Sequence, residues 1–368
     1  MRRRLIRKRG ELSAGKWPCV LLSVFLMTCM APLLAGDGQT DILPNGKVTF
    51  TISKPGSYVL TDNVTMTANI DCIKITANNV SLDLNGHTIT GMGSDSGTAR
   101  GIMASACTGI CIRNGTILSF GGDGIITGAN ARIMDVILED NGGEGIKALD
   151  CCTIAGNTCY RNSNACPDTG GRAFGIDADD GCTIINNNCS DNNATNLGAY
   201  AFGIRAGDGC TIIGNTCHDN TGLGESADAY GIFAKGNCMI AQNTCSENKG
   251  QGDKGDGHGI YIDGGRCVVR DNNCSENTGK SKVYGIKVRA GKTRVEGNSC
   301  RNHDPGLGID IYSTLSGCLV IRNDTEGNAD GISMGNASHY CAENMCTDGI
   351  INTTGVKMGE GDRSNISF

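Results

Sequence analysis

Apolar and polar residues alternate along most of the chain in short pieces of three to five residues, and groups of these pieces recur. From Gly175 the chain reads GIDADDGCTIINNNCSDNN, and from Gly203 it reads GIRAGDGCTIIGNTCHDNT. Gly-Ile pairs begin at residues 175, 203, 231 and 259, which are 28 residues apart. No stretch sustains a period of 3.6, so helices are not indicated. The pattern predicts coils of short parallel β-strands that stack about 4.8 Å apart and together bury a continuous core.

The repeat also predicts columns of equivalent residues along the stack. We expect the isoleucines of the Gly-Ile pairs to point inward, namely Ile176, Ile204, Ile232, Ile260, Ile286, Ile309 and Ile332. Two asparagine columns follow in each coil, the first being Asn187, Asn215, Asn243, Asn272, Asn298 and Asn323 and the second Asn192, Asn220, Asn248, Asn277, Asn302 and Asn328. Asparagine tolerates left-handed backbone, bonds its own turn and bonds its neighbours when stacked. We therefore interpret these columns as turn support rather than as a binding ladder.

At this point the sequence resembles a known family. The elements G-I-x-A, T-I-x-x-N-x-C and x-x-N, together with NNVSLDLNGHTITG from Asn78 to Gly91, are similar to those of pectate-lyase-like and NosD-like β-helix proteins. The resemblance covers about residues 42–340. It implies an all-β, right-handed parallel β-helix of roughly twelve coils. It does not imply one activity, because this fold hosts lyases, hydrolases, epimerases, adhesins and carriers.

The two ends of the chain differ from the repeat. Residues 1–35 hold seven Lys or Arg, one acid and an apolar run from Val20 to Leu34, which is typical of an export signal. The run is short for a transmembrane helix, although an uncleaved anchor is the alternative. We expect an N-terminal cap and first coils over 36–100, the repeats over 101–335, and a C-terminal cap or tail over 336–368. The predicted location is periplasmic, cell-surface or extracellular, with no stable membrane span after signal cleavage.

Composition narrows the class of partner. The 368 residues include 55 Gly but only 6 Pro, and aromatics are 4%, which fits a thin repeated core and excludes collagen. The formal net charge is −6, and it falls to about −12 once the basic leader is removed. A nucleic-acid partner is therefore not expected.

Most of the 21 cysteines fall into two further columns. The first is Cys152, Cys182, Cys210, Cys238, Cys267 and Cys318, and the second is Cys159, Cys189, Cys217, Cys245, Cys274 and Cys300. We favour reduced, buried thiols that behave as small apolar groups, because stacked parallel Cβ vectors strain a disulfide. Vertical disulfides are the alternative, and a metal–thiolate ladder has no C-x-x-C motif behind it. Cys341 and Cys346 lie outside the repeat in this interpretation and are the expected disulfide pair.

The strand after each Gly-Ile pair predicts a binding face. Its outward residues include Asp177, Arg205, Asp310 and Tyr312, and in the family this sheet commonly lines the substrate groove. We select a mixed strip with two adjacent exposed rings as a glycan-binding site, consisting of Phe233, Lys235, Tyr261, Asp263, Lys287 and Arg289. An ordinary exposed sheet with mixed charges is the alternative. The variable loops before each Gly-Ile pair would rim the same face.

Hydrolase signatures are incomplete. Gly257-His258-Gly259 resembles the G-H-G motif of polygalacturonases, but no N-T-D is present. Aromatic residues fill the slot of His258 in sister coils, so we interpret His258 as a stacked ring rather than as a catalytic base. Asp263 and Asp310 are the only loose candidates for paired catalytic carboxylates. No catalytic residue is assigned, and whether the protein is an enzyme stays open.

Three aspartates suggest a cation. Asp150, Asp180 and Asp208 each stand two residues before a cysteine of the first column, so they should stack on successive coils. Stacked carboxylates repel, and a Ca²⁺ ion between them would relieve the repulsion with the oxygen ligands that it prefers. The alternative is that these aspartates are turn residues facing water.

The sequence leaves three functions open. The leading one is an exported β-helix that binds polysaccharide or serves as a cell-surface glycan-interacting structural protein. The second is a polysaccharide lyase or glycoside hydrolase acting on the groove of the first sheet. The third is an accessory role in metal maturation, like that of the NosD proteins.

Overall fold

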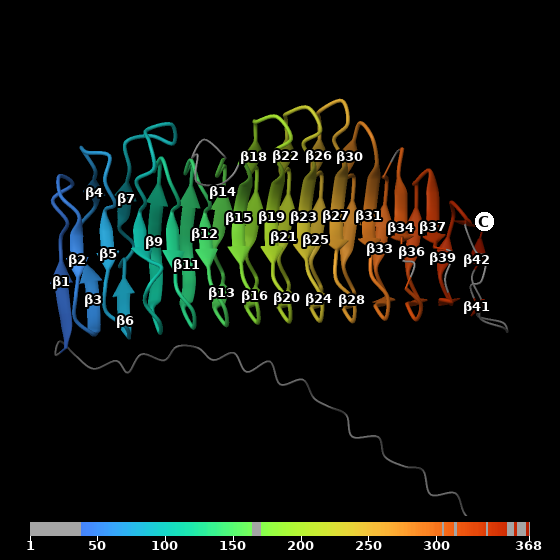
Figure 1. Ribbon diagram of the computed structural model, residues 1–368, viewed down its shortest axis with the longest axis horizontal. Coiled ribbons are helices and arrows are strands. Elements are labelled where there is room, and N and C mark those ends of the chain that lie inside the picture. The colour runs from blue at the N-terminus through green and yellow to red at the C-terminus, as the bar shows by residue number, and fades with distance from the viewer. Residues whose placement is uncertain are drawn as a thin grey trace, which may run out of the picture. The chain divides into compact units, whose positions relative to one another are not determined.

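The computed structural model describes residues 38–163, 171–303, 305–312, 315–335, 338–351, 357–358 and 366–367. The predicted export signal lies outside these ranges. From residue 38 onward the chain winds into stacked coils of short parallel strands, as predicted (Figure 1). The described residues contain no α-helix, so no helix among them is suited to crossing a membrane.

One strand from each coil enters a 13-stranded parallel sheet, which begins in the first coils and runs unbroken across residues 100 and 335. Its strands, in order, are β2 (Phe50–Ile52), β5 (Ile73–Ile75), β8 (Ile102–Ala104), β10 (Ile125–Thr127), β12 (Ile146–Ala148), β15 (Ala173–Ala178), β19 (Ala201–Ala206), β23 (Ala229–Ala234), β27 (Gly257–Ile262), β31 (Val283–Val288), β34 (Leu307–Ile311), β37 (Asp330–Met334) and β40 (Ile350–Ile351). The Gly-Ile pairs identified in the sequence therefore each mark a strand of this sheet.

The other strands of each coil form a 25-stranded sheet with two parallel tracks. The first coils contribute β1 (Gln39–Ile42), β3 (Gly56–Leu60), β4 (Val64–Thr65), β6 (Val80–Asp83) and β7 (Thr88–Thr90), followed by the long strands β9 (Cys111–Leu118) and β11 (Arg132–Glu139). One track then continues through β13 (Thr153–Ala155), β16 (Thr183–Ile185), β20 (Thr211–Ile213), β24 (Met239–Ala241), β28 (Val268–Arg270), β32 (Arg294–Glu296), β35 (Leu319–Ile321), β38 (Tyr340–Ala342) and β41 (Lys357–Met358). The other continues through β14 (Thr158–Tyr160), β17 (Asn188–Ser190), β21 (Thr216–His218), β25 (Thr244–Ser246), β29 (Asn273–Ser275), β33 (Ser299–Arg301), β36 (Asp324–Glu326), β39 (Met345–Cys346) and β42 (Ile366–Ser367).

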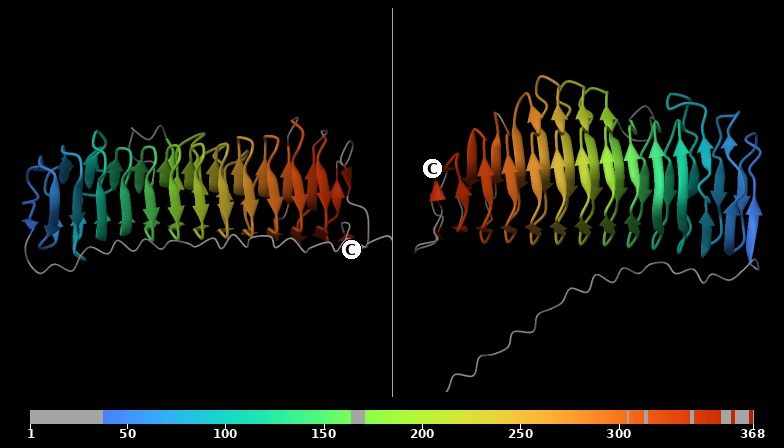
Figure 2. Two further views of the ribbon diagram at one scale, coloured as in Figure 1. Left: turned by 90° about the horizontal axis from the view of Figure 1, so that it is seen from below. Right: turned by 180° about the vertical axis from the view of Figure 1, so that it is seen from behind.

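Four consecutive coils carry an extra short strand in the loop that precedes the 13-stranded sheet. These strands form a small parallel sheet of β18 (Asn193–Ala194), β22 (Thr221–Gly222), β26 (Lys249–Gly250) and β30 (Thr278–Gly279). Figure 2 shows from behind that their loops rise above the neighbouring coils along one edge of the stack. The loops are thus regular structures rather than the purely variable segments that the sequence suggested.

The Gly-Ile pair has a steric explanation. A Cβ on Gly203 would lie 2.7 Å from the carbonyl oxygen of Gly231, 2.9 Å from the Cβ of Cys217 and 3.0 Å from Nδ2 of Asn220. The glycine therefore faces the core, and so does the isoleucine that follows it, which is fully buried. Two consecutive inward residues place the side chains just before and just after the pair on the outer face of the sheet.

The first asparagine column forms the predicted ladder. In coil after coil the side-chain Nδ2 of one asparagine donates to Oδ1 of the next, for example from Asn187 to Asn215 at 2.9 Å. The same Oδ1 accepts the backbone N–H of Asn187 at 2.9 Å, and Nδ2 of Asn187 also donates to the carbonyl of Ile154. These buried amides thereby satisfy backbone groups that the turns leave without a strand partner. The structural interpretation of this column is confirmed.

The second asparagine column is correct except at one position. It runs from Asn141 through Asn162, Asn192, Asn220 and Asn248 to Asn277, with the same amide-to-amide bonds. Asn302 is exposed and has a positive φ of 59°, whereas the next residue, His303, is buried and donates its backbone N–H to Asn328. A one-residue shift in this coil therefore puts a histidine in the slot that the repeat predicts for Asn302.

The two cysteine columns are present, but they differ in chemistry. In the second column Cys189 and Cys217 are stacked on paired strands, fully buried and free, and burial raises the thiol pKa of these two well above the ordinary value. First-column thiols also act as hydrogen-bond groups: Sγ of Cys182 accepts the backbone N–H of Cys152 at 3.3 Å and donates to the carbonyl of Leu149 at 3.2 Å. Thiols of the first column therefore hydrogen-bond to the backbone of neighbouring coils, as the asparagine amides do, and are not only apolar core residues.

The predicted disulfide between Cys341 and Cys346 does not form. Cys341 lies on β38 opposite Val320, and Cys346 lies on β39 opposite Thr325, so the two belong to different inward columns. Cys346 is a buried free cysteine. The spacing of the Gly-Ile pairs becomes irregular here and suggests that the repeat has ended, but the coils continue through both residues.

Candidate functional site

Two lines of side chains cover the outer face of the 13-stranded sheet. The outward row consists of the residues that follow each Gly-Ile pair, namely Lys147, Asp177, Arg205, Phe233, Tyr261, Lys287, Asp310 and Ser333. The ring column consists of residues that precede the pair, namely Phe174, Phe202, Tyr230, His258 and Tyr284. Each line places one side chain on each successive coil in strict register.

The ring column is a stack of five flat side chains. Neighbouring ring centroids lie 4.9 Å apart from Phe174 to Phe202, 4.9 Å from there to Tyr230, 4.7 Å to His258 and 5.3 Å to Tyr284. His258 is 1% exposed, Nδ1 has no hydrogen-bond partner, and burial lowers its pKa well below the ordinary value. His258 is therefore a neutral stacked ring, as the comparison of sister coils predicted.

Phe233 and Tyr261 lie on the outer face, but they are not the two open rings that we expected. Their planes are 11° apart with centroids at 5.4 Å, so they stack on each other along the axis. Both also pack edge-on against Tyr230 of the ring column, at 5.8 and 5.4 Å. Tyr261 is only 9% exposed. These contacts make the pair part of an outer aromatic core rather than a pair of free platforms for sugars.

Accessible chemistry lies beside this aromatic core. Lys235, Asp263 and Arg289 are exposed, and Nη1 of Arg289 donates to Oη of Tyr261 at 3.1 Å and to Asp263 at 3.4 Å. Tyr312 has a side chain that is 66% exposed, the largest open ring on this face among the described residues. The structure therefore places Lys235, Asp263 and Arg289 of the predicted strip at equivalent positions of successive coils, with Tyr312 next in line.

Lys287 lies among three tyrosine rings. Its Nζ is 4.0 Å from the centroid of Tyr284, 5.7 Å from that of Tyr312 and 5.8 Å from that of Tyr261. Burial lowers the pKa of Lys287, while Asp310 on the next coil acts in the opposite direction. Asp310 is 5% exposed, and burial raises its pKa. The sequence analysis considered Asp310 and Asp263 as a pair of catalytic carboxylates. Such a pair requires both carboxylates to face solvent, and Asp310 is buried.

Nearer the N-terminus the same two lines carry charges instead of rings. Arg100, Asp123 and Glu144 precede their Gly-Ile pairs in the slot that the ring column fills in later coils, and Lys147, Asp177 and Arg205 follow theirs in the outward row. Nε of Arg100 is 3.2 Å from Asp123, Nζ of Lys147 is 2.8 Å from Glu144, and Arg205 pairs with Asp177. We call these six residues the charged section. Asp123, Glu144 and Lys147 were missed in the sequence, although the GGDGI and GGEGIK segments align them with the later rings.

Asp150, Asp180 and Asp208 stack on successive coils, and their carboxylates accept backbone amides. Oδ1 of Asp150 accepts the backbone N–H of Asp180 at 3.1 Å, and Oδ1 of Asp180 accepts that of Asp208 at 2.8 Å. Asp208 in turn accepts the N–H of Gly236 at 2.8 Å. Among the described residues, no three His, Cys, Asp or Glu side chains converge in a way that could hold a metal ion. The carboxylates satisfy turn amides, and calcium binding stays an untested prediction.

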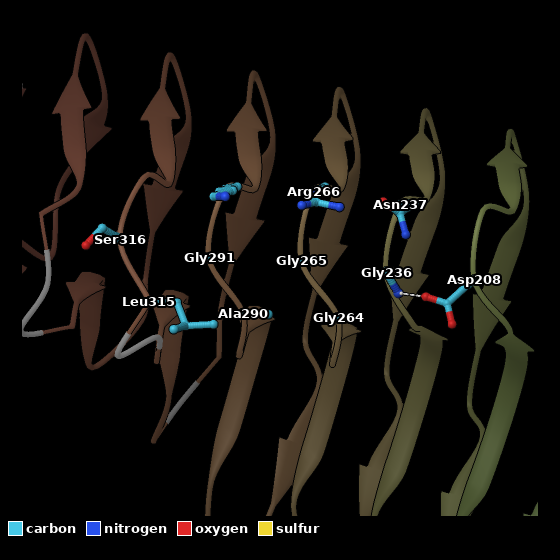
Figure 3. A pocket seen from close by; sticks show the side chains of 11 residues that line it. Asp208, Gly236, Asn237, Gly264, Gly265, Arg266, Ala290, Gly291, Leu315 and Ser316 are labelled. Atoms are coloured by element: carbon cyan, nitrogen blue, oxygen red, sulfur yellow. Dashed lines mark hydrogen bonds between the residues drawn. The ribbon is translucent and has the colours of Figure 1, made fainter.

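A groove lies beside this face, at the turns where its strands end. It has a volume of about 480 Å³ and crosses several coils at the turn just after Lys235, Asp263 and Arg289 (Figure 3). Glycines form its floor because the coils come close together here: a Cβ on Gly264 would lie 2.3 Å from the backbone nitrogen of Gly236. The side chains of Arg266 and Lys292 are exposed along it. The groove therefore continues the accessible surface from Lys235, Asp263 and Arg289 into the turns that follow them.

Comparison with known proteins identifies the fold. Residues 168–325 match the family model described as "Right handed beta helix region". The fold of the chain is a right-handed parallel β-helix. Among solved structures it is similar to the A-modules of two Azotobacter vinelandii mannuronan C-5 epimerases, AlgE6 and AlgE4. The first match has 14% identity, a TM-score of 0.57 and coverage of 88% of this chain and 91% of the other. The second has 12% identity, a TM-score of 0.52 and coverage of 85% and 91%.

At such low identity these matches establish the fold of the β-helix and nothing finer. No curated protein sequence matches this chain. The function therefore has to be argued from the outer face of the 13-stranded sheet itself.

Proposed function

We propose that this β-helix is an exported protein that binds polysaccharide on the outer face of the 13-stranded sheet, between β23 and β34. The observation that carries the proposal is a line of exposed side chains, one on each of four successive coils, which ends at Tyr312. Lys235, Asp263 and Arg289 offer hydrogen-bond donors and acceptors, and the open tyrosine ring offers an apolar face, which is the combination that sugars require. The solved structures with a similar fold include two enzymes that are named for their action on mannuronan, a polysaccharide.

The shape of this region also suits a chain-like ligand. The outward row repeats one side chain per coil, and the adjacent groove runs across the same coils (Figure 3). A polymer can contact several equivalent positions at once, so that modest contacts add up. Export and a cell-surface location remain predictions from the sequence, since the leader lies outside the described residues.

Affinity electrophoresis and a glycan array test this proposal. Tyr312→Ala should weaken binding to any retained polysaccharide by about tenfold or more, as expected for the loss of one aromatic–sugar contact of about 1.4 kcal/mol. The matched control is Tyr340→Ala, because Tyr340 is also exposed, at 42%, but lies on β38 of the other sheet. Equal affinity of the wild type and Tyr312→Ala for every bound glycan would contradict the proposal.

A further inference from the structure

The aspartate ladder at the turns stops where the groove begins. Oδ1 of Asp208 accepts the backbone N–H of Gly236 at 2.8 Å, which is the last bond of the ladder (Figure 3). Gly236, Gly265 and Gly291 follow Asp208 at the equivalent position of the next coils, and glycine has no side chain that could accept the next amide. The N–H groups of Gly265 and Gly291 therefore donate to no other residue in the part of the chain that the structure describes. Two backbone donors on the floor of the groove are left for water or a ligand.

The turn also becomes longer in these coils. Three residues lie between the inward Ala234 and Cys238, whereas four lie in the equivalent turns of the next two coils, between Ile262 and Cys267 and between Val288 and Thr293. The residues at both ends of each turn are buried, so the added residue enlarges the outer surface and leaves the core unchanged. In repeat proteins such insertions commonly lie on the binding face.

Two cations without carboxylate partners line the same groove. Arg266 and Lys292 are exposed on adjacent coils, and neither forms an ion pair with a described residue. Both have a positive φ, of 64° and 62°, at a position that Gly181 and Gly209 fill in earlier coils. Long side chains are disfavoured in left-handed backbone, so the turn itself does not explain them. Their charge is also opposite to that of the whole chain, which is −6.

The carboxylates next to the groove are already engaged. Asp208 serves the amide of Gly236, and Asp263 lies 3.4 Å from Nη1 of Arg289. Asp208 gives the groove a negative end, so an anion is favoured further on, beside Gly265 and Gly291.

We propose that this part of the groove binds a sulfate or phosphate group that is carried by the polysaccharide. The donors available are the guanidinium of Arg266, the ammonium of Lys292 and the amides of Gly265 and Gly291. Arginine binds such oxyanions bidentately, and backbone N–H groups in glycine-rich turns bind them because no side chain keeps the ligand at a distance. An esterified sulfate or phosphate has three free oxygens for these donors, whereas a carboxylate has two.

The inference rests on the proposed function for the molecule that carries the anion. Lys235, Asp263 and Arg289 each stand at the start of a turn that lines the groove. A sugar ring on the outer face can therefore extend a charged substituent into the groove. The proposal narrows the ligand to polysaccharides that bear sulfate or phosphate esters.

Four polymers with one backbone test the class of anion. Binding of the full chain to dextran, carboxymethyl dextran, dextran sulfate and dextran phosphate is measured at about 0.15 M salt, which screens long-range attraction. The three charged polymers have matched charge densities. We expect dextran sulfate and dextran phosphate to bind at least about tenfold more tightly than carboxymethyl dextran, and dextran to bind most weakly.

Two variants test the groove as the place of binding. The double variant Arg266→Gln/Lys292→Gln should lose about tenfold or more in affinity for dextran sulfate. Its matched control is Arg132→Gln/Lys54→Gln, which removes the same two charges from exposed positions away from the groove. Gly236→Asn extends the ladder, because its Oδ1 can accept the N–H of Gly265 as Asp208 accepts that of Gly236. This variant leaves the net charge unchanged and should also lose about tenfold, since it occupies one donor.

The other outcomes contradict the inference at different points. Equal losses in the groove pair and the control pair would reduce the binding to general charge attraction. Equal affinity for carboxymethyl dextran would overturn the preference for sulfate and phosphate, and no binding to any charged dextran would overturn the site. If Gly236→Asn does not fold, as judged by its melting curve, the two double variants still decide. Full binding by Tyr312→Ala together with losses in the groove variants would contradict the proposed function and keep the oxyanion site, and the reverse result would contradict the oxyanion site alone.

Discussion

The outer face of the 13-stranded sheet has a charged section and an aromatic section, the latter consisting of Tyr230, Phe233, His258, Tyr261 and Tyr284. Both are built on strands of the same sheet and differ in the side chains just before and just after each Gly-Ile pair. At β10 and β12 the slot before the Gly-Ile pair bears a carboxylate. At β15 and β19 it bears a ring beside a charged outward residue, and from β23 to β31 both lines bear mainly rings. Parallel stacking in register brings identical groups together. Rings gain from this arrangement, whereas carboxylates repel and need cations or protons between them. The difference shows that a β-helix tolerates charge on this face only at a cost that stacked rings avoid.

The same rule explains where the ring column ends. On its N-terminal side the slot of Phe174 is taken by Glu144, and on its C-terminal side the slot of Tyr284 is followed by Leu307. Rings therefore occupy a continuous block that overlaps the coils with the extra strands β18 to β30, whose loops lie along that edge. We infer that these loops help to bury the ring column, which explains why Phe174, Phe202 and Tyr230 are 3–8% exposed on an outer face.

The largest expected effect concerns the ring column as a second core. Tyr230→Ala removes a ring that stacks on Phe202 and His258 and supports Phe233 and Tyr261, so we expect a loss of about 3–5 kcal/mol in unfolding free energy. Tyr312→Ala removes an exposed ring and should cost less than about 0.5 kcal/mol. Urea denaturation of the two variants measures both values. Equal losses would show that the aromatic section is not a core.

The charged section should instead become more stable when its charge is removed. The folded-state pKa of Glu144, about 8, lies above its ordinary value of 4.5, so the folded protein holds a proton that the unfolded chain has lost. Stability therefore falls as the pH rises from about 4.5 to 8, and the full penalty is present above 8. We expect Glu144→Gln to be about 4–5 kcal/mol more stable than the wild type at pH 9 and equal to it at pH 4. Melting curves across this range test the expectation, and a constant difference between the two proteins would contradict it.

His258, in the ring column, should show the opposite pH dependence of stability. Its folded-state pKa lies well below the ordinary 6.5, so unfolding allows the ring to take up a proton at acidic pH and stability falls as the pH drops below about 6.5. Phenylalanine fills the same slot in sister coils. His258→Phe should therefore raise the unfolding free energy by up to about 2 kcal/mol at pH 5 and change it little at pH 8. The acid-specific gain separates loss of a titrating ring from general repacking, which would act equally at both pH values.

The fold could be predicted from the sequence because one repeat fixes many contacts at once. Each Gly-Ile pair identifies a strand, and Asn187 and Asn215 mark the same turn in successive coils, so an error in one coil does not propagate to the next. The errors arose where a coil changes length. Asn302 was shifted by one position, and Cys341 and Cys346 were removed from columns that in fact continue.

The site was less predictable, for a physical reason. Alternation shows which side of a sheet a residue faces, but not whether a neighbouring coil covers it. Tyr261 faces outward as expected and is nevertheless buried, because Tyr230, Phe233 and His258 surround it. Glu144 was overlooked because its slot was identified only from the rings of later coils. Aligning every residue two positions before an inward isoleucine would have placed it beside Asp123 and Phe174.

The smallest expected effect concerns the turns beside the two sections. Asp150, Asp180 and Asp208 occupy these turns next to the charged section, whereas glycines occupy them next to the aromatic section and open the groove. Because Oδ1 of Asp180 serves a backbone N–H, asparagine can replace it and keep the same acceptor. We expect Asp180→Asn to change the unfolding free energy by less than about 0.5 kcal/mol.

We also expect the melting temperature of the wild type to be the same in Ca²⁺ and in a chelator. A Ca²⁺-dependent rise that Asp180→Asn abolishes would instead show that the free oxygens of the column bind the ion, since a ligand that binds only the folded state raises its stability. The two sections would then differ in a cation as well as in their side chains.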